Sequence, residues 1–362
     1  MKIGIITIHN VSNYGAVLQS YALKEIISKR HVVFIIDYDN RHVSKSLDII
    51  RIGYDFHSFL GAGKDILRLF PRVRVIKKFN KFIKENMNLI DFQSNKLNCL
   101  DVLISGSDQI WNPLCVSKNK EIIPEYFLSF ANDNQKKISY ASSCGSYIYN
   151  DKEKVIIKQL LSSYSNISVR EYETSTYLDC LLGTPVSHVL DPTLLLKKDE
   201  WLSKLKIKKE EVSENKKYIL LYVIKKTDLL KKVVAKIKKD LGLKVILVNQ
   251  GLFFDSVVDS HIRDAGPVDF ISYVNNASFI ITDSFHGTTF SIIFNKPFVS
   301  VSPGKNINRI SSLLAKLHLE SRIVYDLDEI ENITYDIDFD DVNERLNLER
   351  KKSIDFIYNS ID

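Results

Sequence analysis

The residues whose types and spacing are best suited to catalysis lie between positions 266 and 297. An apolar run at 278–282 predicts a buried strand, which ends at a polar turn, 283–287, and a helix-like run follows at 288–294. In open α/β sheets, ligands bind beyond the carboxyl ends of the strands, where the next helix presents N–H groups to anions. His286 lies in this turn, and an imidazole titrates near neutral pH. The pattern predicts a proton donor beside an anion site.

Basic residues in other loops are suited to hold the anion. Lys305 and Arg309 follow the next predicted strand, although ordinary surface charge explains them equally well. Arg170 ends a short predicted strand, and a guanidinium there suits bidentate capture of a carboxylate or phosphate. An ion pair with Glu171 or Glu173 is the alternative for Arg170.

Two more polar loops follow predicted strands, at residues 9–15 and 105–113. In the first, Asn13 or Ser12 can cap the next helix and donate to a bound oxygen, although such residues are common in loops. In the second, a carboxylate, two amides, a hydroxyl and an indole occur within nine residues. That set is typical of a sugar site, where hydroxyls are hydrogen-bonded and a ring packs on an aromatic side chain. Trp111 is also compatible with the core.

The elements that must position these loops alternate between strand and helix along the whole chain, which predicts a mostly parallel sheet wrapped by helices. We expect an α/β fold of two Rossmann-like domains facing across a cleft. The first domain covers 1–195, the second covers 196–330, and the helix at 341–359 packs back on the first. The predicted strands are 2–8, 32–37, 102–105, 138–142, 167–169, 188–190, 217–224, 244–248, 278–282, 297–301 and 323–325.

Composition excludes several classes of protein. The chain has 362 residues, 45% of them apolar and 26% charged, with a net charge of +6. Its N-terminus does not resemble a signal peptide, and no apolar run approaches the ~20 residues of a membrane span. Four scattered cysteines without a CxxC pair predict neither a metal site nor disulfides, and favour a cytoplasmic location. Nucleic acid is not expected as a partner. The basic segment 64–84 is either an exposed helix face or an amphipathic helix that contacts the inner face of a membrane.

Taken together, these segments resemble the polysaccharide pyruvyl transferase family. The matching pieces occur in the family's order and cover about residues 1–325. They are Asn13–Leu23 (NYGAVLQSYAL), Gly106–Pro113 (GSDQIWNP), Tyr140–Gly145 (YASSCG), Ser168–Glu171 (SVRE), Asp191–Leu195 (DPTLL), Thr282–Gly287 (TDSFHG) and Asn295–Phe298 (NKPF).

The resemblance implies a GT-B-like fold, phosphoenolpyruvate as co-substrate without a cofactor, and a sugar of a bacterial surface glycan as acceptor. The product would be a ketal, commonly across O4 and O6 of a galactose-type sugar, in the surface polysaccharide or in its lipid-pyrophosphate-linked precursor. By analogy His286 is the catalytic acid, and Arg170 with Lys305 or Arg309 anchors the donor. Asp108 and His9 are our candidates for the base. The other expected donor contacts are Ser284, Gly287 and Thr288, and the expected acceptor contacts are His9, Asn13, Tyr14, Gln109, Trp111 and Asn112.

Two alternative functions fit the same architecture, because a fold does not determine a function. One is a GT-B glycosyltransferase that uses a nucleotide-sugar. The other is a glycan-binding protein without activity. The cationic set of His286, Arg170 and Lys305 argues against the second alternative, because a neutral sugar does not require it.

Overall fold

A computed structural model describes residues 1–49, 69–207, 217–251, 255–302, 304 and 307–362. The chain divides into two compact units. Unit 1 contains Met1–Leu47, Lys81–Leu196 and Asn347–Asp362, and unit 2 contains Asp48–Asn80 and Lys197–Leu346. The segment 48–80, which the sequence interpretation assigns to the first domain, therefore falls in unit 2, and the end of the last helix falls in unit 1.

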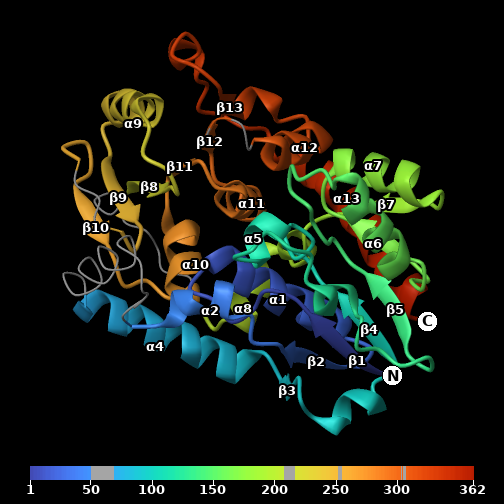
Figure 1. Ribbon diagram of the computed structural model, residues 1–362. Helices are drawn as coiled ribbons and strands as arrows, with labels where there is room; N and C mark the ends of the chain where they lie inside the picture. The colour runs from blue at the N-terminus through green and yellow to red at the C-terminus, as the bar shows by residue number, and fades with distance from the viewer. Residues whose placement is uncertain (50–68, 208–216, 252–254, 303, 305–306) are drawn as a thin grey trace. The chain divides into compact units, whose positions relative to one another are not determined.

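The described part of unit 1 contains a parallel sheet in the order β3-β2-β1-β4-β5 (Figure 1). Its strands are β1 (Lys2–Ile6), β2 (Val32–Asp37), β3 (Leu89–Asp91), β4 (Val102–Ser105) and β5 (Lys136–Ser139). A parallel pair, β6 (Ile167–Val169) and β7 (Val186–His188), joins β5 through a bridge between Ile138 and Asn166. The buried runs of β1 and β4 are apolar on both faces, as expected for strands covered by helices on both sides.

Helices of unit 1 begin and end at recognisable signals. Asn13 caps α1 by accepting the N–H of Ala16, and Asn150 and Glu153 form a capping box at α6. Gly183 ends α7 in the left-handed conformation. The helices are α1 (Tyr14–Ile27), α2 (Arg41–Ser44), α5 (Pro113–Val116), α6 (Asp151–Leu161) and α7 (Tyr172–Leu182), with 3-10 turns η1 (Lys45–Leu47), η2 (Asn95–Cys99), η3 (Pro124–Phe127) and η4 (Pro192–Leu195).

The described part of unit 2 contains a second parallel sheet, in the order β10-β9-β8-β11-β12-β13. The strands are β8 (Tyr218–Tyr222), β9 (Lys244–Val248), β10 (Ser260–Ile262), β11 (Phe279–Thr282), β12 (Phe298–Val301) and β13 (Ile323–Val324). Apolar residues of these strands pack with α9 in one core that includes Ile219, Val233 and Ile281. The helices are α8 (Lys198–Lys204), α9 (Asp228–Leu241), α10 (Pro267–Asn276), α11 (Phe285–Ile293) and α12 (Asn308–Lys316), with η6 (Glu320–Arg322) and η7 (Ile330–Asn332).

Two long helices contain two of the four points at which the chain passes from one unit to the other. They are α4 (Leu69–Asn86) and α13 (Phe339–Ile361). Within unit 1, the last turns of α13 are fixed by Ser353, which accepts the N–H of Leu190, and by Arg350, which donates to the carbonyl of Leu194. These bonds join α13 to the segment that leaves β7.

The basic segment predicted at 64–84 is partly visible as α4, and residues 64–68 lie outside the described residues. Two of its basic side chains are paired within unit 2. Arg74 donates to Asp264 across 2.5 Å, and Lys78 donates to Asp269 across 2.7 Å. The apolar side chains of Val75 and Phe79 are fully buried. Arg74 and Lys78 are therefore paired with acids of the same unit. In the part of the chain that the structure describes, no helix combines the length and hydropathy needed to span a membrane.

Candidate functional site

The His286 turn is more helical than its sequence predicts. Helix α11 begins at Phe285, with Ser284 as its N-cap, so His286 is the second residue of the helix instead of a member of a loop before it. Close packing requires a glycine at position 287, because a Cβ there would overlap the hydroxyl of Thr282 at the end of β11. The glycine therefore lets the first turn of α11 lie directly against the strand, which fixes His286 at the strand's carboxyl end.

His286 lies in a polar and aromatic setting at the positive end of α11. Its side chain is buried, with 8% exposure, and its ring lies edge-on to Phe285 at 5.2 Å between centroids. Backbone N–H groups in the first turn of a helix have no acceptor within the helix, and the helix dipole there favours anions.

The residues around His286 are fixed by hydrogen bonds to the neighbouring strands. The carboxylate of Asp283 accepts the N–H groups of Ile224 and Lys225, each at 2.7 Å. Burial raises the pKa of Asp283, while these two bonds and the charge of Lys225 oppose the rise. The hydroxyl of Thr288 is 2.7 Å from that of Ser300 in β12. The Thr288 side chain is therefore hydrogen-bonded within unit 2.

Of the two downstream cations, one can be located. The guanidinium carbon of Arg309, in the first turn of α12, lies 5.9 Å from the ring centroid of Phe285. Arg309 and His286 therefore both contact Phe285 at the start of α11. Lys305 lies outside the described residues. The carboxyl edge of unit 2 thus brings together His286, Arg309, Ser284 and Asp283.

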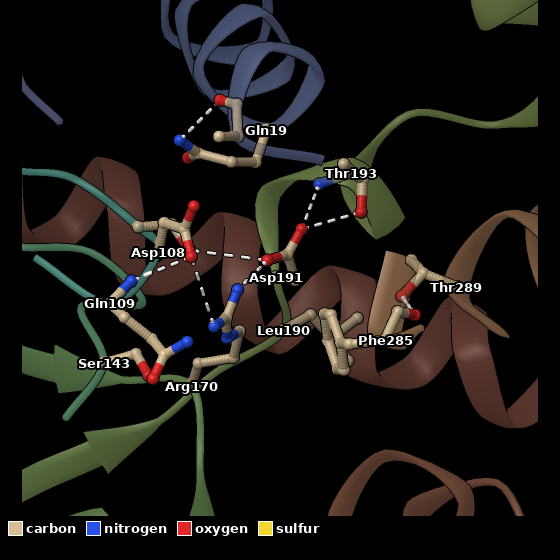
Figure 2. Close-up of polar contacts among 12 residues, drawn as sticks. Gln19, Asp108, Gln109, Ser143, Arg170, Leu190, Asp191, Thr193, Phe285 and Thr289 are labelled. Atoms are coloured by element: carbon tan, nitrogen blue, oxygen red, sulfur yellow. Dashed lines mark hydrogen bonds and ion pairs between the residues drawn. The ribbon is translucent and has the colours of Figure 1, made fainter. Parts of the chain in front are cut away.

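Arg170 occupies a buried charge cluster in unit 1 (Figure 2). Its side chain is 2% exposed and donates to Asp191 at 2.8 Å and to Glu171 at 3.3 Å, and Asp108 lies 3.8 Å away. Burial alone would lower the pKa of Arg170, but the charges of Glu171, Asp191 and Asp108 outweigh it and raise the pKa. The ion-pair alternative describes this geometry.

Asp108 is the most accessible acid of this cluster. Its side chain is 15% exposed, whereas those of Glu171 and Asp191 are 2% and 0% exposed. Its backbone has a φ of 70°, a conformation that non-glycine residues adopt mainly where the surroundings impose it. One carboxylate oxygen accepts the N–H of Gln109 at 2.8 Å. One cation and three carboxylates leave an excess of negative charge, which favours hydroxyl donors over a phosphate.

The rest of the 105–113 loop is structural. Trp111 is 1% exposed, stacks on Phe127 at 5.1 Å between centroids, and donates to the carbonyl of Tyr126. The core alternative therefore describes this indole. Asn112 caps α5 and donates to the side chain of Gln109 at 2.9 Å. These amides hold the loop that carries Asp108.

His9, in the first loop, pairs with Asp37, a residue that the sequence analysis did not single out. Nε2 of His9 lies 3.0 Å from Asp37 at the end of β2, and Nδ1 lies 3.2 Å from the carbonyl of Thr7. Both ring nitrogens therefore face acceptors. The hydrogen bond from His9 lowers the pKa of Asp37, against the effect of its partial burial. Asn13 is used as the cap of α1, and Tyr14 is buried.

Three residues of these sites were missed: Asp37, Asp191 and Asp283. Asp37 ends a predicted strand, so its position at a ligand-binding edge was a usable signal. Asp191 belongs to the DPTLL segment, which carries part of the family resemblance but was given no site role. In the described part of the chain, no group of three or more His, Cys, Asp or Glu side chains is arranged to hold a metal.

Comparison with known proteins gives a family and a fold. The family described as polysaccharide pyruvyl transferase matches residues 13–305. No curated protein matches the sequence. The UDP-GlcNAc 2-epimerase of Neisseria meningitidis, solved with UDP-GlcNAc, aligns with a TM-score of 0.50 at 12% identity, over 98% of this chain and 94% of its own. The 2-epimerase of Rickettsia bellii gives 0.49 at 13% identity, over 100% and 97% of the two chains. At 12% identity, the likeness to the Neisseria structure shows the fold alone, which is GT-B-like with two Rossmann-like units.

Proposed function

Because the chain belongs to the polysaccharide pyruvyl transferase family, as its match over residues 13–305 shows, we propose that its donor is phosphoenolpyruvate and its product a cyclic ketal. The acceptor would be two hydroxyls of a galactose-type sugar, O4 and O6, in a bacterial surface polysaccharide or its lipid-pyrophosphate-linked precursor. Phosphate would leave. Contact with the inner face of a membrane would follow only for the lipid-linked acceptor.

The observation that supports this proposal is the position of His286. It is the second residue of α11, at the carboxyl end of β11, and Arg309 shares its contact with Phe285. Phosphoenolpyruvate carries a carboxylate and a phosphate, so it requires cations and N–H donors at short range. Arg309 and the first turn of α11, from Ser284 to Gly287, would hold the donor, with Lys305 as a second cation.

The reaction needs an acid first. Protonation of C3 of the donor by His286 makes C2 electrophilic, and a sugar hydroxyl adds to C2 and loses its proton. Phosphate then leaves C2, and the second hydroxyl adds there and loses its proton, which closes the ring. General acid catalysis contributes about 10²–10⁴-fold to such steps. An imidazolium beside a polyanion is well matched to the role.

The proposal assigns the base to unit 1. Asp108 is the exposed acid of the charge cluster, and Arg170 would fix the position of its carboxylate. The pair of His9 and Asp37 is the second candidate. Donor anchoring by Arg170 itself, which the resemblance implies, stays a prediction that the variants below can separate from a positioning role.

The decisive experiment measures phosphate release and the mass of the acceptor. Wild type with phosphoenolpyruvate and galactosides should release phosphate and add one pyruvyl group with loss of water. His286→Ala should lose transfer by at least ~10²-fold and keep its melting temperature. His318→Asn, at an exposed histidine of unit 2, is the matched control.

Normal turnover by His286→Ala would remove this residue from the mechanism. Stabilisation by nucleotide-sugars but not by phosphoenolpyruvate would instead identify a glycosyltransferase, and sugar binding without phosphate release would identify a glycan-binding protein.

A further inference from the structure

A cavity of about 550 Å³ lies in unit 1, at the amino ends of β6 and β7. Asn166, which precedes β6, and Pro185, which precedes β7, line it, whereas Arg170 follows the carboxyl end of β6. The cavity is therefore at the opposite end of this strand from the charge cluster. Its volume is within the range of small-molecule sites, about 300–1,000 Å³.

The wall of the cavity is apolar and aromatic. Leu161 and Ile167 are buried, and the rings of Tyr164 and Phe356 are half-buried. The hydroxyl of Tyr164 is already hydrogen-bonded to Ser105, at 2.6 Å, so this residue offers the cavity its ring. An aromatic and aliphatic surface suits the apolar face of a sugar ring.

The rim is polar and nearly neutral. Asn166, Thr184 and Ser187 line it, and within the described part of the chain their side chains form no hydrogen bond. Helices α6 and α7 both end at this rim, at Leu161 and Leu182. The carboxyl end of a helix carries unpaired carbonyls and partial negative charge, which favours hydroxyl donors and disfavours anions. Lys158 is the one cation among the lining residues, and it is exposed.

We propose that this cavity binds a neutral hexose unit of a glycan chain, as a docking site separate from the two carboxyl edges described above. This inference rests on the proposed function in one respect: the polymer that docks here is the one whose sugar is modified. A docking site raises the local concentration of acceptor without taking part in the reaction. Its residues should therefore affect long acceptors and not short ones.

The test measures the binding of a galactose hexasaccharide by calorimetry, with phosphate release as a second readout. Thr184→Trp fills the cavity from an exposed loop position, and Asn166→Ala removes one rim amide. Gln159→Ala removes an amide from the exposed surface of α6 outside the cavity and is the matched control. We expect Thr184→Trp to weaken hexasaccharide binding at least tenfold, Asn166→Ala to weaken it to a smaller extent, and Gln159→Ala to leave it unchanged.

The two readouts separate this inference from the proposed function. With methyl galactoside as acceptor, Thr184→Trp should release phosphate at the wild-type rate, because the monosaccharide does not depend on docking. Wild-type hexasaccharide binding by Thr184→Trp and Asn166→Ala would overturn the inference, as would displacement of the hexasaccharide by an alkyl detergent but not by galactose. Absence of phosphate release from every variant, with hexasaccharide binding still lost in Thr184→Trp, would overturn the proposed function and keep the docking site.

Discussion

Arg170 and Asp191 form a buried ion pair in unit 1, with a distance of 2.8 Å between Nη1 and Oδ2. They are 21 residues apart in the sequence. Asp191 also accepts the N–H and the hydroxyl of Thr193, at 2.9 and 2.7 Å, so one carboxylate connects the end of β6 to η4. This pair makes Arg170 a central support of the unit.

Arg170→Ala should therefore unfold more easily. Removing the guanidinium leaves Asp191 and Glu171 buried without their cation, and breaking a buried pair in this way costs about 3–5 kcal/mol. Urea unfolding measures the loss. Arg170→Lys should lose less, because it keeps the charge, and Arg345→Ala, which breaks an exposed pair with Asp341, should be close to wild type. Wild-type stability of Arg170→Ala, together with loss of phosphoenolpyruvate binding, would show that Arg170 anchors the donor instead.

Asp108→Asn removes the negative charge of this side chain and keeps its shape. Asparagine tolerates the left-handed conformation that residue 108 adopts, so the fold should be retained. If the carboxylate accepts the hydroxyl proton, its loss should lower kcat by about 10²-fold or more while leaving phosphoenolpyruvate affinity unchanged. Steady-state kinetics measure both values. Asp133→Asn, at an exposed position of unit 1, is the control. A variant with wild-type kcat would show that Asp108 is not the base.

Asp37→Asn should change how stability depends on pH. The pKa of Asp37 is lowered in the folded protein, chiefly by its hydrogen bond with His9. A lowered pKa contributes stability that is present above the ordinary aspartate value of about 3.9 and is lost as the pH falls through the folded value. The stability difference between wild type and variant should therefore be largest above pH 4 and disappear in more acidic solution. Urea titrations at several pH values check this, and a difference independent of pH would contradict it.

The inner strands of the two larger sheets were predicted accurately from the sequence. The strands at 32–37, 102–105 and 244–248 have the predicted bounds, because their apolar runs are bounded by polar residues. Strands β3 and β10 were not predicted, because their residues are largely exposed at a sheet edge and form no buried apolar run. The start of α11 at Phe285 was not predicted, because Gly287 was interpreted as part of a turn. In the structure this glycine lies inside the helix and allows close packing on Thr282, which only the fold reveals.

Candidate site residues were harder to assign than strands. Arg170 and Trp111 have the chemistry of ligand contacts, but they pair with Asp191 and Tyr126, which are 21 and 15 residues away in the sequence. Whether such a side chain faces a ligand or a neighbour depends on tertiary packing, which spacing along one chain does not encode. His286 was easier to locate because a strand followed by a helix already defines an anion-binding edge.

Lys296, which follows helix α11, offers a further pH-dependent prediction. Burial, and secondarily the charge of Lys198, lowers its pKa to about 8. The ordinary lysine value is about 10.4, so between these two pH values the unfolded chain binds more protons than the folded one, and stability rises with pH. Below about pH 8 the folded protein bears the full cost of the buried charge.

Lys296→Met, which removes the charge, should therefore be more stable than wild type at pH 7, and the advantage should shrink toward pH 10. Thermal unfolding at pH 7, 8, 9 and 10 measures this, with Lys232→Met, on the exposed side of α9, as a control without such a trend. A variant that is less stable at pH 7 would show that the Lys296 ammonium has a stabilising partner.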